Sequence, residues 1–234
     1  APPRVVKFAP GLLVALVAVS SARDLQASVS NAHERSLPDQ RNLLTAWVDS
    51  TLPPAGYIGQ NEVHKVFNPD WGGFVGVHSY PLIEMAALVD RPVADWRARG
   101  AEYAIMRYQD FAQLPEDVLS EILLLRTFPP DENLTGPAMA IVRLRAMQYE
   151  AGVRLGDVQL VGYDLPSEVA KAGNTIEFRH YWRADLPLPA GYNVFNHLLD
   201  ADGALVAQVD GLPMPDARRT TDTWRYPDEI LIGS

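Results

Sequence analysis

The spacing of hydrophobic and polar positions changes near residue 145. Before that point, stretches with helical spacing alternate with short apolar runs. The clearest helix is predicted within residues 37–56, where apolar side chains recur three and four residues apart, Asp39 can cap the start and two prolines end the pattern. The alternation predicts a small α/β layer. Further helices are predicted at 92–100 and 114–122, strands at 56–63, 101–108, 122–129 and 138–145, and a helix or buried segment at 81–90.

After residue 145 the chain contains strand patterns with no helix between them. These runs are separated by Pro, Gly and Asp, which is typical of an antiparallel β-sandwich. The fold class is therefore predicted as α+β: a small α/β domain at 24–147 followed by a β-sandwich at 148–234. The last residues read as the start of another strand, so we expect the sandwich to be incomplete at the C-terminus. The predicted strands are 157–165, 175–184, 192–200 and 204–211.

The last two of these strands are joined by Asp202-Gly203, which predicts a β-hairpin with a two-residue turn. That turn places His197 directly opposite Gln208. Both faces of the hairpin are largely apolar, so we expect both to be covered. A buried imidazole and a buried amide need partners, and we interpret His197 and Gln208 as a structural polar pair rather than a catalytic site.

The N-terminus carries an apolar run at 8–22, preceded by Arg4 and Lys7. The run is shorter than the ~20 residues of a full membrane-spanning helix. It is consistent with the remnant of a transmembrane span at 1–23, with a secretory signal segment, or with a buried core helix. Under either membrane interpretation the basic residues favour a cytoplasmic start. Everything after Arg23 would then lie on the extracytoplasmic side.

Composition and motifs exclude several classes of function. The net charge of -9 argues against a nucleic-acid partner, and the absence of cysteine removes thiol chemistry. No phosphate-binding loop, nucleophile elbow or zinc motif occurs. We therefore predict no catalytic residue, no metal ligand and no cofactor. A free-standing hydrolase would need Glu62, His64 and Asp70 to converge, and it is the least favoured alternative.

Three aromatic residues are candidates for carbohydrate contact. Trp71, Tyr80 and Trp224 lie in or beside predicted loops. An exposed aromatic ring can stack on the apolar face of a sugar. The alternative for each ring is burial in the core.

Residues 39–59 and 95–107 resemble the soluble segment behind the last membrane span of bacterial family 39-like membrane glycosyltransferases. Residues 180–213 and 220–224 are similar to the β-sandwich that follows it in many such proteins. The resemblance implies a transferase that uses a polyprenyl-phosphate sugar and has its active site on the extracytoplasmic face. The catalytic carboxylate of that family lies in an early extracytoplasmic loop, which no residue here matches.

This chain would then be a non-catalytic extracytoplasmic tail at the cell membrane. Its partners would be the lipid bilayer, through the apolar segment, and a glycan or lipid-linked sugar. The alternative is a secreted carbohydrate-binding or adhesion module, with the apolar run as its signal segment.

Overall fold

The computed structural model describes residues 26, 28–29, 37–52, 56–67, 81–165, 171, 173–185, 188, 191–214, 219–224 and 226–233. The apolar run at 8–22 lies outside them, as do Asp70, Trp71 and Tyr80. Within the described residues, no helix has the length and apolar character needed to cross a membrane.

The described residues fall into two compact units. Of the described residues, the smaller contains 26, 28–29, 37–39 and 131–136, and the larger contains those from Gln40 onward except 131–136. In the smaller unit, the backbone N–H of Thr135 donates to the carbonyl of Pro38 at 2.9 Å, beside a bridge between Asp39 and Thr135. The domain boundaries predicted at residues 23 and 147 stay predictions.

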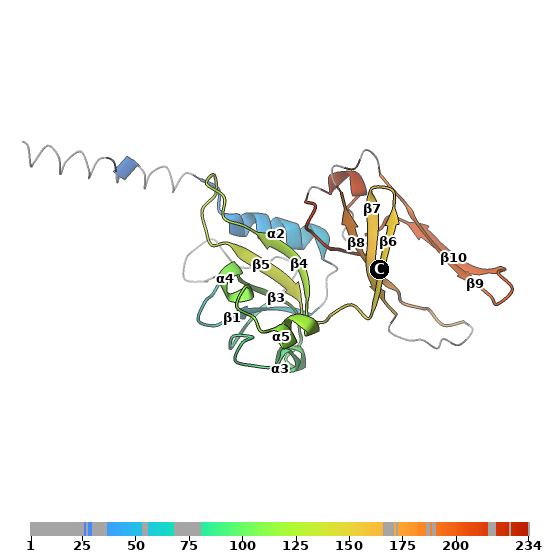
Figure 1. Cartoon of the computed structure of the whole chain (residues 1–234), viewed down its shortest axis with the longest axis horizontal. Coiled ribbons are helices and arrows are strands. Elements are labelled where there is room, and N and C mark those ends of the chain that lie inside the picture. Colours follow the sequence, from blue (N-terminus) through green and yellow to red (C-terminus); the bar gives the residue numbers. More distant parts are fainter. Residues whose placement is uncertain are drawn as a thin grey trace, which may run out of the picture. The chain divides into compact units, whose positions relative to one another are not determined.

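The larger unit contains a five-stranded mixed sheet in the order β2-β1-β3-β5-β4. Figure 1 labels its strands β1, β3, β4 and β5. Strand β1 is parallel to both β2 and β3, whereas β5 is antiparallel to β3 and β4. The segment at 81–90, predicted as a helix or buried segment, contributes edge strand β2 instead. Its apolar run is too short for periodicity to separate strand from helix. The strands are β1 (Tyr57–Asn61), β2 (Leu82–Met85), β3 (Ala101–Arg107), β4 (Leu123–Phe128) and β5 (Met139–Arg143).

Helices cover both faces of this sheet. Successive side chains of a strand point to opposite faces, so neighbouring residues of β3 pack against different helices. Tyr103 and Ile105 of β3 pack in the hydrophobic cluster that includes Trp47 of α2, whereas Ala104 packs with Trp96 of α3 on the other side. The predicted stripe of α2 is buried except for Leu43, which is 40% exposed. The helices are α2 (Gln40–Thr51), α3 (Val93–Ala98), α4 (Tyr108–Phe111) and α5 (Glu116–Glu121).

The chain continues into an antiparallel sheet in the order β11-β8-β7-β6. Together with the mixed sheet it gives the predicted α+β fold, with a sandwich-like arrangement. Strand β6 was not predicted, since most of its positions are exposed and carry no alternating pattern. The strands are β6 (Tyr149–Leu155), β7 (Val158–Asp164), β8 (Arg179–Ala184) and β11 (Leu231–Gly233), with a short 3-10 turn, η2 (Thr221–Thr223), between β10 and β11.

The two sheets share one hydrophobic cluster. Tyr181 of β8 and Ile232 of β11 belong to the same cluster as Trp47 of α2. Two polar contacts reinforce this continuity: Trp47 Nε1 donates to the buried carboxylate of Glu229 at 2.6 Å, and the N–H of Ile230 donates to the carbonyl of Leu125 at 2.7 Å. The C-terminal strand is therefore tied to the N-terminal layer.

Strands β9 (Val194–Leu199) and β10 (Leu205–Gly211) form a separate two-stranded hairpin. The predicted pairing of His197 with Gln208 is confirmed, but the turn differs. Asp200 pairs with Ala204 around a three-residue loop, in which Gly203 adopts a φ of 82°. A bulge between Leu205 and Ala207 shifts the register by one residue, which restores the predicted pairing.

The expectation that the hairpin is covered on both faces is wrong. Every position of β10 is exposed, and so is His197. Gln208 donates to Asp210 at 3.1 Å, and His197 Nε2 lies 3.9 Å from the same carboxylate. Because water reaches these side chains, burial does not force them to pair with each other.

Candidate functional site

The carboxyl ends of the three parallel strands border a cleft of about 360 Å³. Strand β1 lies between β2 and β3. The chain therefore passes from β1 to β2 on one side of it and then crosses to β3 on the other side. Ligands of open α/β sheets bind in the crevice outside the carboxyl ends of the strands at such a switch point. We name this pocket the β1–β3 cleft.

One wall of the β1–β3 cleft is a loop held in place by two side chains at the end of β1. The carboxamide oxygen of Asn61 accepts the N–H groups of Val63 and His64 at 2.8 and 3.1 Å. The buried Gln60 side chain donates to the carbonyl of Phe67 at 2.8 Å and accepts its N–H at 3.0 Å. The loop that carries His64 is therefore fixed at both ends.

His64 faces a carboxylate across the β1–β3 cleft. Its Nδ1 lies 3.1 and 3.3 Å from the two oxygens of Asp110, in the first turn of α4 directly behind β3. The His64 side chain is 48% exposed and that of Asp110 is 22% exposed. A carboxylate on Nδ1 orients an imidazole and leaves Nε2 for another partner. The pair can therefore hydrogen-bond to a ligand hydroxyl or transfer a proton.

The bottom of the β1–β3 cleft is apolar. Leu88, Trp96 and Met106 line it and are almost completely buried. An apolar lining with a few polar groups at the rim is the usual composition of a small-molecule site. The cleft is therefore suited to a ligand with one apolar face and several hydroxyl groups.

The residues of the hydrolase alternative are only partly brought together. Glu62 and His64 both line the β1–β3 cleft, whereas Asp70 lies outside the described residues. The carboxylate that reaches His64 is Asp110, which the sequence analysis missed. Asp110 follows β3 by three residues, and a parallel pairing of β1 with β3 would have indicated that it lies near His64. The sequence did not predict that pairing, because the segment that forms β2 was not assigned as a strand.

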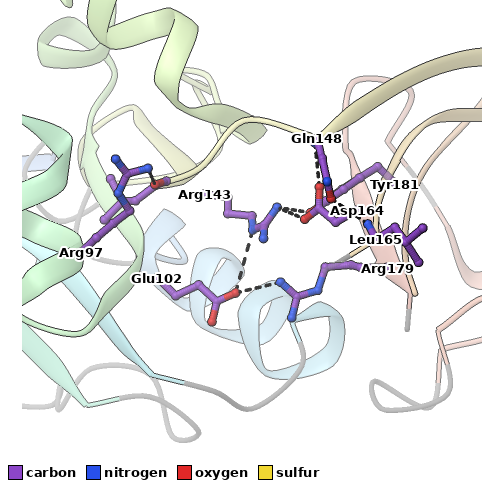
Figure 2. Close-up of polar contacts among 9 residues, drawn as sticks. Arg97, Glu102, Arg143, Gln148, Asp164, Leu165, Arg179 and Tyr181 are labelled. Carbon is purple, nitrogen blue, oxygen red and sulfur yellow. Dashed lines mark hydrogen bonds and ion pairs between the residues drawn. The ribbon is translucent and has the colours of Figure 1, made fainter. Parts of the chain in front are cut away.

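A second polar group, the Arg143 cluster, consists of Glu102, Arg143, Asp164, Arg179 and Tyr181 (Figure 2). Arg143 Nη1 donates to Asp164 at 2.8 Å and also to the hydroxyl of Tyr181. The Tyr181 hydroxyl donates to the same Asp164 oxygen at 2.6 Å. Arg179 donates to Glu102 at 3.1 Å, and Glu102 lies 3.9 Å from Arg143 Nε. The cluster links β3 and β5 to β7 and β8.

The surroundings keep Asp164 and Arg179 charged and Tyr181 neutral. Burial opposes ionisation of Asp164, but hydrogen bonds from Tyr181 and the Gln148 N–H, together with the Arg143 charge, hold the pKa of its carboxyl below the usual value. Burial raises the pKa of the Tyr181 phenol, so the hydroxyl keeps its proton. Burial alone would lower the pKa of Arg179, but the charge of Glu102, together with smaller contributions from Tyr103, Tyr181 and Asp164, raises it above the usual value.

The predicted carbohydrate contacts receive little support. Trp224 is completely buried and packs with Trp182, so its ring offers no face to a ligand, which corrects the expectation of an exposed position. Trp71 and Tyr80 lie outside the described residues. In the part of the chain that the structure describes, no group of three or more metal-binding side chains occurs.

No protein-family model, curated protein or solved structure matches this chain.

Proposed function

We propose that this chain is the non-catalytic extracytoplasmic region of a membrane glycosyltransferase that takes its sugar from a polyprenyl-phosphate donor. The order of the layers carries the proposal. A mixed sheet covered by helices is followed by an antiparallel sheet. The resemblance of residues 39–59, 95–107 and 180–213 implies this order for the region behind the last membrane span.

The N-terminal sequence supports attachment to the lipid bilayer. Arg4 and Lys7 precede the apolar run at 8–22, and basic residues favour the cytoplasmic side of a span. The folded region after Arg23 would then lie outside the cytoplasm, on the side where the polyprenyl-phosphate sugar is consumed.

The β1–β3 cleft supports a role in holding part of a ligand. Its apolar bottom suits the carbon face of a sugar, and the His64–Asp110 pair suits a hydroxyl group. The region would present an acceptor glycan, or part of a lipid-linked sugar, to the transferase site. The reacting carboxylate would belong to the membrane part of the enzyme.

The genomic reading frame and a topology assay test the proposal. We expect the frame upstream of Ala1 to encode several hydrophobic spans, with an acidic residue in the first extracytoplasmic loop. A reporter that is active only outside the cytoplasm, fused after Ser234 of the protein with its upstream spans, should be active. A fusion made after Lys7 is the control on the opposite side.

Two outcomes would contradict the proposal. An active reporter after Lys7 combined with an inactive one after Ser234 would reverse the predicted orientation. A gene that begins just before Ala1 would remove the transferase and leave the secreted carbohydrate-binding or adhesion module as the better interpretation.

A further inference from the structure

A cavity of about 1010 Å³ lies where the start of β3 and the end of β5 meet the loop that precedes β8. It shares no lining residue with the β1–β3 cleft. Four members of the Arg143 cluster line it: Glu102, Arg143, Asp164 and Arg179. Figure 2 shows their side chains pointing toward one another. We name it the Arg143 cavity.

Arg143 retains hydrogen-bonding capacity in this cavity. Its side chain is 5% exposed, and its Nη1 is occupied by Asp164 and Tyr181. Within the described residues, its buried Nε has no hydrogen-bond acceptor, because the nearest oxygen of Glu102 is 3.9 Å away. A buried donor without an acceptor is unfavourable. The Nε is closed to solvent, so a ligand oxygen would accept from it only after the neighbouring Glu102 side chain shifts.

The charges around the cavity compensate one another. Arg143 faces Asp164, Arg179 faces Glu102, and Arg97 donates to Glu121 at 3.2 Å. The remaining charged groups of the lining are one of each sign, Arg145 and Glu177.

This balance leaves no excess positive charge for a phosphate dianion. It does leave donors and acceptors side by side, which is what hydroxyl groups require because they both donate and accept hydrogen bonds.

The loop before β8 supplies an apolar wall. Ile176 is 41% exposed, and both it and the half-buried Phe178 line the cavity. The Phe178 ring is positioned by neighbouring rings, with its centroid 5.1 Å from that of Tyr163 and 4.4 Å from that of His180. A pre-positioned aromatic ring can pack on the carbon face of a sugar.

We propose that the Arg143 cavity binds a short, neutral carbohydrate. The paired arginines and carboxylates would bind its hydroxyl groups, and Ile176 and Phe178 would contact its carbon face. The inference goes beyond the proposed function, because it assigns a ligand class to a second cavity and needs neither a membrane anchor nor a transferase.

Binding is tested on the full 234-residue chain by titration calorimetry and saturation-transfer NMR. The neutral probes are maltose, cellobiose and N,N′-diacetylchitobiose, and the charged comparison is glucose 1-phosphate. We expect at least one neutral sugar to bind, and glucose 1-phosphate to bind no more tightly. Arg145→Ala, which removes a donor at an exposed position, should weaken binding about tenfold.

Matched variants separate cavity contacts from general effects. Arg91→Ala removes an exposed arginine that does not line the cavity, and it should change affinity less than twofold. Ile176→Ala should weaken binding severalfold, whereas Leu119→Ala, at a similar exposure of 39%, should not. Circular dichroism of all four variants checks that each keeps the fold.

Three outcomes would overturn the inference: no neutral sugar bound at millimolar concentration, tighter binding of glucose 1-phosphate, or equal effects of Arg145→Ala and Arg91→Ala. None of these would alter the reporter result that tests the membrane topology. Conversely, a failed topology test would leave the binding result intact.

Discussion

The Arg143 cluster yields the sharpest prediction about stability. Asp164→Asn keeps the shape of the side chain but removes the negative charge that Arg143 and Tyr181 contact. The paired side chains are 5% and 11% exposed, so the substitution leaves a buried guanidinium without its main counter-charge. Breaking such a pair from one side typically costs about 3–5 kcal/mol. Glu102 stays nearby at 3.9 Å, which favours the lower end, about 3 kcal/mol.

The free energy of unfolding is measured at pH 7 by urea titration, followed through tryptophan fluorescence. Asp185→Asn is the matched control, because Asp185 pairs with Arg154 at the surface, where both side chains are more than half exposed. A surface pair contributes at most about 1 kcal/mol. If Asp164→Asn destabilised the protein no more than Asp185→Asn, the Arg143 cluster would not have the structural weight inferred for it.

Three further predictions concern pH, packing and the hairpin. Burial lowers the pKa of His180 from 6.5 to about 4, so the folded state favours the neutral imidazole. Because the unfolded chain takes up this proton at a higher pH than the folded one, the free energy of unfolding is highest above pH 6.5 and decreases as the pH falls toward 4. His180→Phe should therefore flatten the pH dependence of the urea midpoint between pH 6.5 and 4, and an unchanged slope would refute this. Gly59→Val should lower the thermal midpoint and destabilise the protein by about 1–3 kcal/mol, because a Cβ at Gly59 would lie 2.4 Å from the ring of Trp96. An unchanged midpoint would show that the ring can move. Asp200→Ala removes the carboxylate that accepts the N–H groups of Asp202 and Ala204, and should speed hydrogen exchange in β9 and β10 without changing global stability. Equal exchange rates would contradict this.

The sequence was sufficient to predict the elements that have a clear hydrophobic spacing of their own. Helix α2 follows from the spacing of Leu44, Trp47 and Val48, all of which are buried. Strand β6 could not be found this way, because its pairing with β7, rather than a buried face, defines it. The pairing of His197 with Gln208 was predicted correctly although the turn was not, since the bulge in β10 offsets the longer loop.

The candidate sites were harder to predict because their members are distant in the sequence. His64 meets Asp110 only because β1 and β3 are parallel neighbours, and that arrangement depends on recognising β2. Arg143 and Asp164 lie on strands of two different sheets, so no local spacing indicates their contact. Because the positive and negative charges of the Arg143 cluster compensate one another, the net charge of the chain does not reveal the cluster either.

The hydrophobic cluster that joins α2 to β8 and β11 limits how this protein can be cut or recombined. A truncation after residue 147 would expose Trp47 and remove Tyr181 and Ile232 from its surroundings. It would also leave the Trp47 indole without the Glu229 carboxylate. In an exchange of segments between proteins of this architecture, both sheets would therefore have to be transferred together.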